Sequence, residues 1–213
     1  NQPAPNAVLS ATSGELLVLN SGIFDPQTSR ISDASFQFAP VTDNHYFVVQ
    51  FDAGKMLSAA QLEKRGFRVA GYVPNNAYLV DASGNDEKAL VALAGVRFVG
   101  AWQPAFKVSD IVRVNAQTKA DLIVEILGFQ GAAIGQLEAA LIAAKLMQPG
   151  VKADHGANIA KVRVSVKGAD LKAFVEQVAA IGEVAWIDSF ELPHLHNVDA
   201  VGPIQSGLAS GGN

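Results

Sequence analysis

The four histidines are the first residues to consider for catalysis or metal binding, because the chain has no cysteine. His194 and His196 stand two residues apart in a segment predicted to be extended, so both imidazoles could lie on one side and share a metal ion. No group of acidic residues at ligand spacing accompanies them. Two exposed histidines in a C-terminal tail are the preferred interpretation, and neither a metal site nor a cofactor is predicted.

Asp154 and His155 form a second pair that could do chemistry, since a histidine oriented by a carboxylate can act as a general base. A Ser-His-Asp triad is assembled by the fold, however, and no serine here lies in a nucleophile motif such as G-x-S-x-G. The glycine-rich motifs of nucleotide-binding sites are absent as well. No catalytic residue is predicted, and the sequence argues against this segment being an enzyme.

Composition excludes several classes of partner. Of the 213 residues, 49% are hydrophobic and 17% are charged, which predicts a globular core rather than a disordered tail. The net charge of −4 offers no basic face for a nucleic acid. Charged residues interrupt the most apolar stretch, Gly131–Met147, so no membrane span is predicted.

The first half combines an arm with a compact module. Residues 1–44 form a polar arm with one strand-like run at residues 16–19. From His45 onward, β-rich and amphipathic runs follow each other in the order β-α-β-β-α-β. The predicted strands are residues 45–51, 67–73, 77–82 and 96–102, and the predicted helices are residues 58–65 and 86–94.

The second half repeats this order. Its predicted strands are residues 121–127, 151–153, 159–166 and 184–190, and its helices are residues 134–147 and 169–181. At a nearly constant offset along the chain, Ala77–Val80 matches Ala160–Arg163, and Trp102 matches Trp186, which indicates an internal duplication. Both tryptophans are expected in a core or on a sheet face.

The predicted fold class is therefore α+β, with two tandem ferredoxin-like modules that have antiparallel sheets. The first module is residues 45–108 and the second is residues 120–192. An arm (1–44) precedes them and an extended tail (193–213) follows. A single sheet continuous across both modules is the alternative.

Several segments carry a resemblance to a known family. Tyr46–Phe51 (YFVVQF), Gly71–Val80 and Val99–Lys107 resemble the N-terminal prosequence of the large alkaline subtilases, a subgroup of subtilisin-like serine peptidases. Ser21–Pro26 is similar to the arm that precedes it there, and Asn197–Gly202 to the start of the mature catalytic domain. The Asp, His-Gly-Thr and Gly-Thr-Ser-Met-Ala catalytic motifs of the family are absent from this chain.

The resemblance implies a propeptide, secreted or extracytoplasmic, whose full-length precursor is a subtilisin-like serine endopeptidase. Its partner would be the cognate catalytic domain, with no nucleic acid and no membrane involved. In this family the propeptide assists folding of the enzyme and then inhibits it, with the open sheet face packed on two enzyme helices. Such a template suits an enzyme whose long-range strand pairings form slowly.

The site residues implied by the resemblance lie in the tail, which would occupy the substrate cleft as a product does. Pro193, His194, Leu195 and His196 would fill the non-primed subsites, with cleavage before Asn197. Tethering keeps the effective concentration of such a tail high. A weaker expectation is that the acidic loop at Asp154 meets helix N-termini of the enzyme, where a carboxylate is favoured.

Two alternatives stay open. A tandem ferredoxin-like ligand-binding or assembly module would need a pocket with convergent polar groups. A stand-alone protease inhibitor would use the same tail without an enzyme of its own. What the gene encodes after Asn213 separates these readings.

Overall fold

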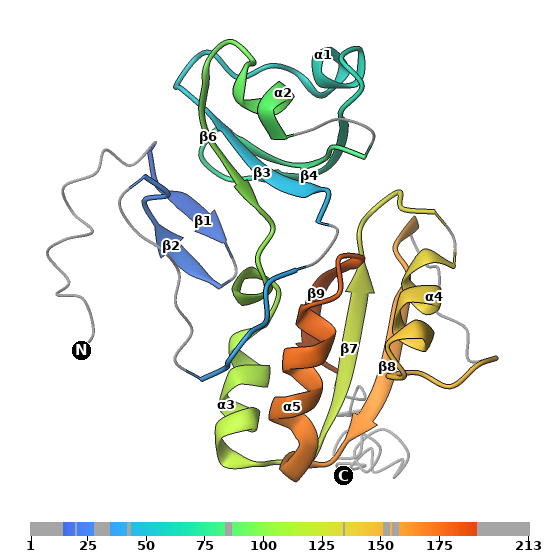
Figure 1. Ribbon diagram of the computed structural model, residues 1–213. Coiled ribbons are helices and arrows are strands. Elements are labelled where there is room, and N and C mark those ends of the chain that lie inside the picture. The colour runs from blue at the N-terminus through green and yellow to red at the C-terminus, as the bar shows by residue number, and fades with distance from the viewer. Residues whose placement is uncertain are drawn as a thin grey trace, which may run out of the picture.

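The computed structural model describes residues 15–19, 21–27, 35–41, 44–83, 87–133, 135–150, 154 and 158–190. These residues form an α+β fold in which each of three sheets is antiparallel (Figure 1). A two-stranded hairpin, a four-stranded sheet and a three-stranded sheet follow one another along the chain. The α+β class with antiparallel sheets is thus confirmed, and a single sheet continuous across both halves is wrong.

The four-stranded sheet belongs to the first half and has the strand order β4-β5-β3-β6. The predicted order β-α-β-β-α-β is confirmed, and both helices lie on one face of this sheet (Figure 1). The strands are β3 (Tyr46–Phe51), β4 (Arg68–Val73), β5 (Ala77–Asp81) and β6 (Val96–Ala101); the helices are α1 (Ala59–Glu63) and α2 (Glu87–Val91).

Alternation along β3 divides its side chains between two cores. Phe47, Val49 and Phe51 pack under the helices with Leu62 of α1 and Leu90 of α2. The side chains between them point to the other face, and that face is covered as well. Every residue of β3 is consequently buried, although a helix lies on only one side of the strand.

An N-terminal hairpin, β1 (Leu17–Leu19) and β2 (Gly22–Phe24), covers this other face. Leu17 packs there with Tyr46 and Val48 of β3. The buried amide of Gln50 donates to the Glu15 carbonyl at 3.2 Å, so the base of the hairpin is tied to the sheet. The predicted strand at residues 16–19 is confirmed, and β2 is an addition that the sequence analysis did not contain.

The three-stranded sheet of the second half has the order β8-β7-β9. Two predicted helices are confirmed and pack against one of its faces. The predicted strand at residues 151–153 lies outside the described residues, and Asp154 pairs with Lys161 as an isolated bridge. The strands are β7 (Leu122–Gly128), β8 (Lys161–Val166) and β9 (Val184–Ser189); the helices are α4 (Gln136–Ala143) and α5 (Gly168–Ala179).

The connection between the halves contains elements that the sequence analysis left unassigned. A short 3-10 helix, η1 (Pro104–Phe106), leads into α3 (Asp110–Thr118), which packs beside α5 (Figure 1). Ser109 caps α3 by accepting from the Val112 amide. Only Val112 and Ala116 of α3 are buried.

Candidate functional site

The predicted tail residues Pro193, His194, Leu195, His196 and Asn197 lie outside the described residues. Asp154 is exposed and stands at the outer edge of the second sheet. Its backbone exchanges two hydrogen bonds with Lys161, at 2.8 and 2.7 Å. Asp154 therefore lies at the edge of the sheet beside β8, and β8 separates it from β7.

The helix-free side of the second sheet, which we call the open face, is a candidate surface. Val124 and Ile126 of β7 point toward α4 and α5, so the residues between them point away. The strand register then places their cross-strand partners on the same side. The open face comprises Ile123, Glu125, Leu127, Lys161, Arg163, Ser165, Trp186 and Asp188, all half-buried or exposed.

An arginine organises the centre of the open face. The Arg163 guanidinium bonds to the Glu125 carboxylate at 2.8 Å and lies 3.6 Å from the ring centre of Phe190. Phe190 follows β9 and still donates its amide to the Ile123 carbonyl, at 2.8 Å. A charged pair and an aromatic ring thus lie together where the chain leaves the sheet, an arrangement suited to a protein partner.

The two tryptophans at matching positions have different surroundings. Trp102 is buried and donates its indole N–H to the Ala185 carbonyl at 3.1 Å, across the junction of the two halves. Trp186 is half-buried on the open face and donates to Asp188 at 3.3 Å. The expectation of core or sheet-face positions is confirmed for both.

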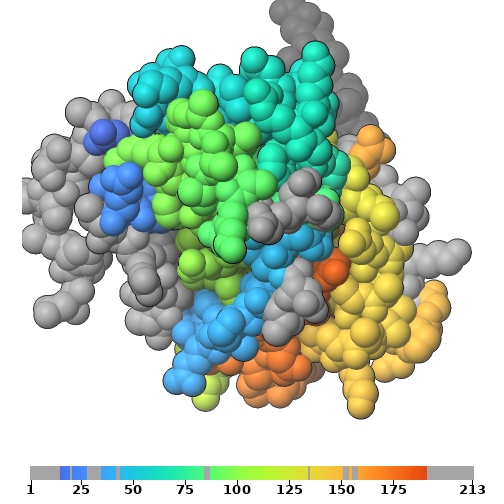
Figure 2. All heavy atoms as spheres, turned by 45° about the horizontal axis from the view of Figure 1, so that its top comes forward, coloured from blue at the N-terminus to red at the C-terminus, as the bar shows by residue number. Residues whose placement is uncertain are grey.

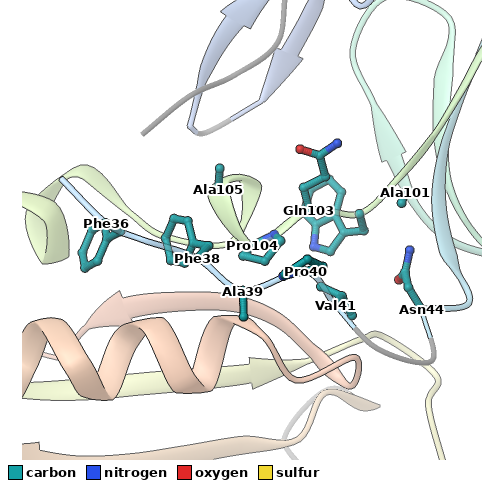
Figure 3. Close-up of a pocket in the computed structure, with 11 residues that line it drawn as sticks. Phe36, Phe38, Ala39, Pro40, Val41, Asn44, Ala101, Gln103, Pro104 and Ala105 are labelled. Atoms are coloured by element: carbon teal, nitrogen blue, oxygen red, sulfur yellow. The ribbon is translucent and has the colours of Figure 1, made fainter. Parts of the chain in front are cut away.

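A pocket of about 500 Å³ lies between the end of the arm and the segment after β6 (Figure 3). Phe38, Pro40 and Val41 line one side and Pro104 the other, and Asn44 and Gln103 supply the polar side chains. None of the described residues that line this pocket has an ionisable side chain. The chemistry of this lining suits binding of a neutral ligand rather than acid–base or nucleophilic catalysis.

A partly buried polar cluster joins the first sheet to the loop after β7. Arg68 donates to Asp81 at 3.1 and 2.6 Å and to the Gln130 carbonyl at 2.6 Å. Burial raises the pKa of Asp81, but hydrogen bonds from Ser83 and Arg68 outweigh it, and the pKa lies below its ordinary value. Burial also raises the pKa of Tyr46, which accepts from Arg68, to about 12. This cluster is structural, since each group is satisfied within the protein.

Within the described ranges, no three histidines, aspartates or glutamates come close enough to hold a metal ion. The helices described by the structure are all too short or too polar to cross a bilayer.

Sequence reasoning did not identify the open face, the pocket or the Arg68 cluster as candidate sites. Apolar and charged residues alternate in residues 159–166, which is typical of a half-buried strand with Arg163 on its polar side. Nothing local predicts that Phe38 and Pro104 line one pocket, or that Arg68 meets Gln130, because the two members of each pair are far apart in the sequence and meet only in the tertiary structure.

Comparison with known proteins gives one match. Residues 18–103 match a family described as a domain of unknown function (DUF8729). The match begins inside β1, contains the whole four-stranded sheet and covers less than half of the chain. No curated protein and no solved structure matches the chain.

Proposed function

We propose that this chain is the propeptide of a secreted subtilisin-like serine endopeptidase, which assists folding of the catalytic domain and then inhibits it temporarily. The proposal rests first on the residues that resemble subtilase prosequences. They form β3, the hairpin of β4 and β5, and the end of β6 with η1. These are the connected elements of one folded unit, as an inherited module requires.

The arrangement of both halves supports a pair of ferredoxin-like modules. The order β4-β5-β3-β6, with two helices on one face, is the strand order of the split βαβ motif. The order β8-β7-β9 of the second half corresponds to three of these four strands, and Asp154 pairs with Lys161 on the side of β8 where the remaining strand would lie. We interpret the second half as the same module with its outer edge reduced in the described residues.

The observation that carries the proposal is the difference between the two helix-free faces. In the first sheet this face is covered by the β1–β2 hairpin and by Phe106 and Phe129. In the second sheet, the helices lie on the opposite side and Arg163 and Ser165 are exposed. The second module is also the one from which the tail continues. The catalytic domain would therefore dock on the open face of the second module.

In this arrangement the tail would run from Phe190 into the substrate cleft. Pro193, His194, Leu195 and His196 would take the non-primed subsites, with cleavage before Asn197. Pro193 lacks an amide donor and favours an extended backbone, as strand addition in a cleft requires. Asp154, at the edge beside β8, would face helix N-termini of the enzyme.

The test is inhibition of the cognate subtilisin-type peptidase by the purified chain, followed over time by mass analysis. Strong inhibition with trimming to a terminus near His196 is expected. Arg163→Ala should weaken inhibition about tenfold, because a central arginine is a typical hot spot of an interface. Arg65→Ala, at an exposed arginine after α1, is the matched control and should inhibit normally.

Absence of inhibition by a chain shown to be folded would reject the propeptide function. Equal inhibition by the Arg163 and Arg65 variants would reject the open face as the docking surface, and a mature N-terminus outside residues 190–205 would reject the tail assignment. Inhibition by a chain whose gene ends at Asn213 would instead identify a stand-alone inhibitor.

A second candidate function, binding of a small ligand, is favoured by the pocket between the arm and η1. A volume of about 500 Å³ falls within the usual range for ligand sites. Because Trp102 lines it, a bound aromatic compound should change the fluorescence of that indole. Titration with toluene, a neutral aromatic compound that does not absorb where tryptophan is selectively excited, in a Trp186→Phe background tests this function; unchanged emission at millimolar toluene would reject it.

A further inference from the structure

The junction between the halves contains a fully buried lysine that the proposed function does not use. Lys107 ends η1, and its side chain has no exposure to solvent. Its amine donates to the Ile181 carbonyl at 2.7 Å, just beyond the last turn of α5. That carbonyl also accepts from the Val184 amide, so it keeps a partner without the lysine.

The backbone around Lys107 is fixed to β9. The Ile187 amide donates to the Lys107 carbonyl at 2.6 Å, and the Ser109 amide donates to the Ile187 carbonyl at 3.0 Å. Val108 pairs in parallel with Ile187 between these two bonds. Residues 107–109 therefore act as a short additional strand where the chain passes from the first half to the second.

Few charges compensate a proton on this amine. Glu183, which precedes β9, is the carboxylate that attracts it. From α3, Arg113 donates to the carbonyls of Ala105 and Val108 and adds a second positive charge to the same segment. The buried residues of α5 carry no ionisable side chain, so this helix contributes no compensating charge from its buried side. Burial lowers the pKa of Lys107 to about 7, against the attraction of Glu183.

We propose that Lys107 makes the junction between the two halves sensitive to pH: the neutral amine holds residues 104–109 against α5 and β9, and its protonation loosens them. The direction follows from the two states of the chain. In the unfolded chain the amine binds its proton at the ordinary pKa of 10.5, and in the native chain near 7. Stability therefore rises with pH between these values, and the full penalty is present below pH 7.

The first test measures urea unfolding of the isolated chain between pH 6 and 9, without any peptidase. The Lys107 contribution should lower the unfolding equilibrium constant about 50-fold between pH 7 and 9. It is obtained as the difference between the wild type and Lys107→Met, because this difference cancels the contributions of the ionisable groups that the two chains share. Lys64→Met makes the same substitution at an exposed lysine; it is the control and should keep the wild-type profile.

The second test reports on the junction itself. With Trp186→Phe, Trp102 remains the sole indole, and its N–H bonds to Ala185 across the junction. Its emission should shift to longer wavelength as the pH falls from 8 to 6, with a midpoint near 7, and should stay constant in the Lys107→Met variant. Identical stability profiles in wild type and Lys107→Met, or a Trp102 emission independent of pH in both, would overturn the proposal.

Discussion

Replacing Arg68 by methionine should lower the free energy of unfolding by about 3 kcal/mol. Methionine keeps the length and much of the apolar stem of the arginine, so the change removes mainly the guanidinium. That group forms the ion pair with Asp81 within the first sheet and the hydrogen bond to the Gln130 carbonyl of the second half. The substitution therefore probes the strand pair and the docking of the halves together.

The magnitude follows from the exposure of the two partners. The Arg68 side chain is 34% exposed and the Asp81 side chain 9%. Breaking a buried ion pair costs about 3–5 kcal/mol and an exposed pair about 0–1 kcal/mol, so this intermediate pair contributes about 2 kcal/mol. The hydrogen bond to Gln130 adds about 1 kcal/mol. Asp81→Asn breaks the pair but leaves the Gln130 contact, and should cost about 2 kcal/mol.

Urea unfolding monitored by circular dichroism, with the double variant completing the cycle, measures these contributions. The coupling energy between Arg68 and Asp81 should be about 1–2 kcal/mol, because Asp81 keeps its bonds from Ser83 when the arginine is absent. A loss below about 0.5 kcal/mol on Arg68→Met, as for an exposed pair, would refute the reasoning. Equal losses for the two single variants would show that the Gln130 contact contributes nothing.

The same cluster predicts a dependence on acid. The folded-state pKa of Asp81 lies below its ordinary value of 3.8, so its stabilisation is complete above that value and is lost as pH falls through the folded pKa. Asp81→Asn should therefore flatten part of the loss of stability below pH 4. Thermal unfolding of both chains from pH 2 to 6 checks this; parallel curves would contradict it.

Three further substitutions test the positions that hold the elements in place, each by urea unfolding. Gly168→Ala should cost about 2 kcal/mol or more, since its Cβ would collide with the carbonyl group of Lys119, and an unchanged unfolding midpoint would show that α5 can shift. Ser58→Ala should cost about 1 kcal/mol by removing the capping box with Gln61; wild-type stability would mean that α1 needs no cap. Leu141→Ala should cost about 2–5 kcal/mol as a fully buried leucine of α4, and a loss below about 1 kcal/mol would place α4 outside the cooperative core.

Much of the secondary structure could be predicted because its signals are local. The β-rich run of β3, the alternation in β8, the Ser58 cap and the stop at Gly66 act within a few residues of the element they define. Asn75 and Asn76 adopt positive φ angles of 66° and 59°, which asparagine tolerates, and so form the turn between β4 and β5. In each case the physical cause, which is a run of β-forming residues, a period, a cap or a turn residue, lies in neighbouring residues of the sequence.

Helix α3 shows where local signals end. Its cap, Ser109, is visible in the sequence, but Ile111 and Val114 are more than half exposed while Val112 and Ala116 are buried. Because apolar residues lie on two sides of this helix, the sequence does not show which of them is buried. Packing against α5, rather than the pattern, decides which side is inside.

The candidate surfaces depend on tertiary structure almost entirely. Figure 2 shows how closely segments from distant parts of the sequence gather on one side of the molecule. Sequence alternation assigns Arg163 to the polar side of a strand. The hairpin, Phe106 and Phe129 cover the helix-free face of the first sheet, so among the described residues the open face belongs to the second sheet. Likewise, nothing in the sequence distinguishes Lys107 from a surface lysine; its burial depends on the packing of the two halves against each other. The period of apolar residues in the sequence shows which side of a helix or strand is apolar. Which other element covers that side depends on contacts between residues far apart in the chain, and such contacts leave no local signal in the sequence.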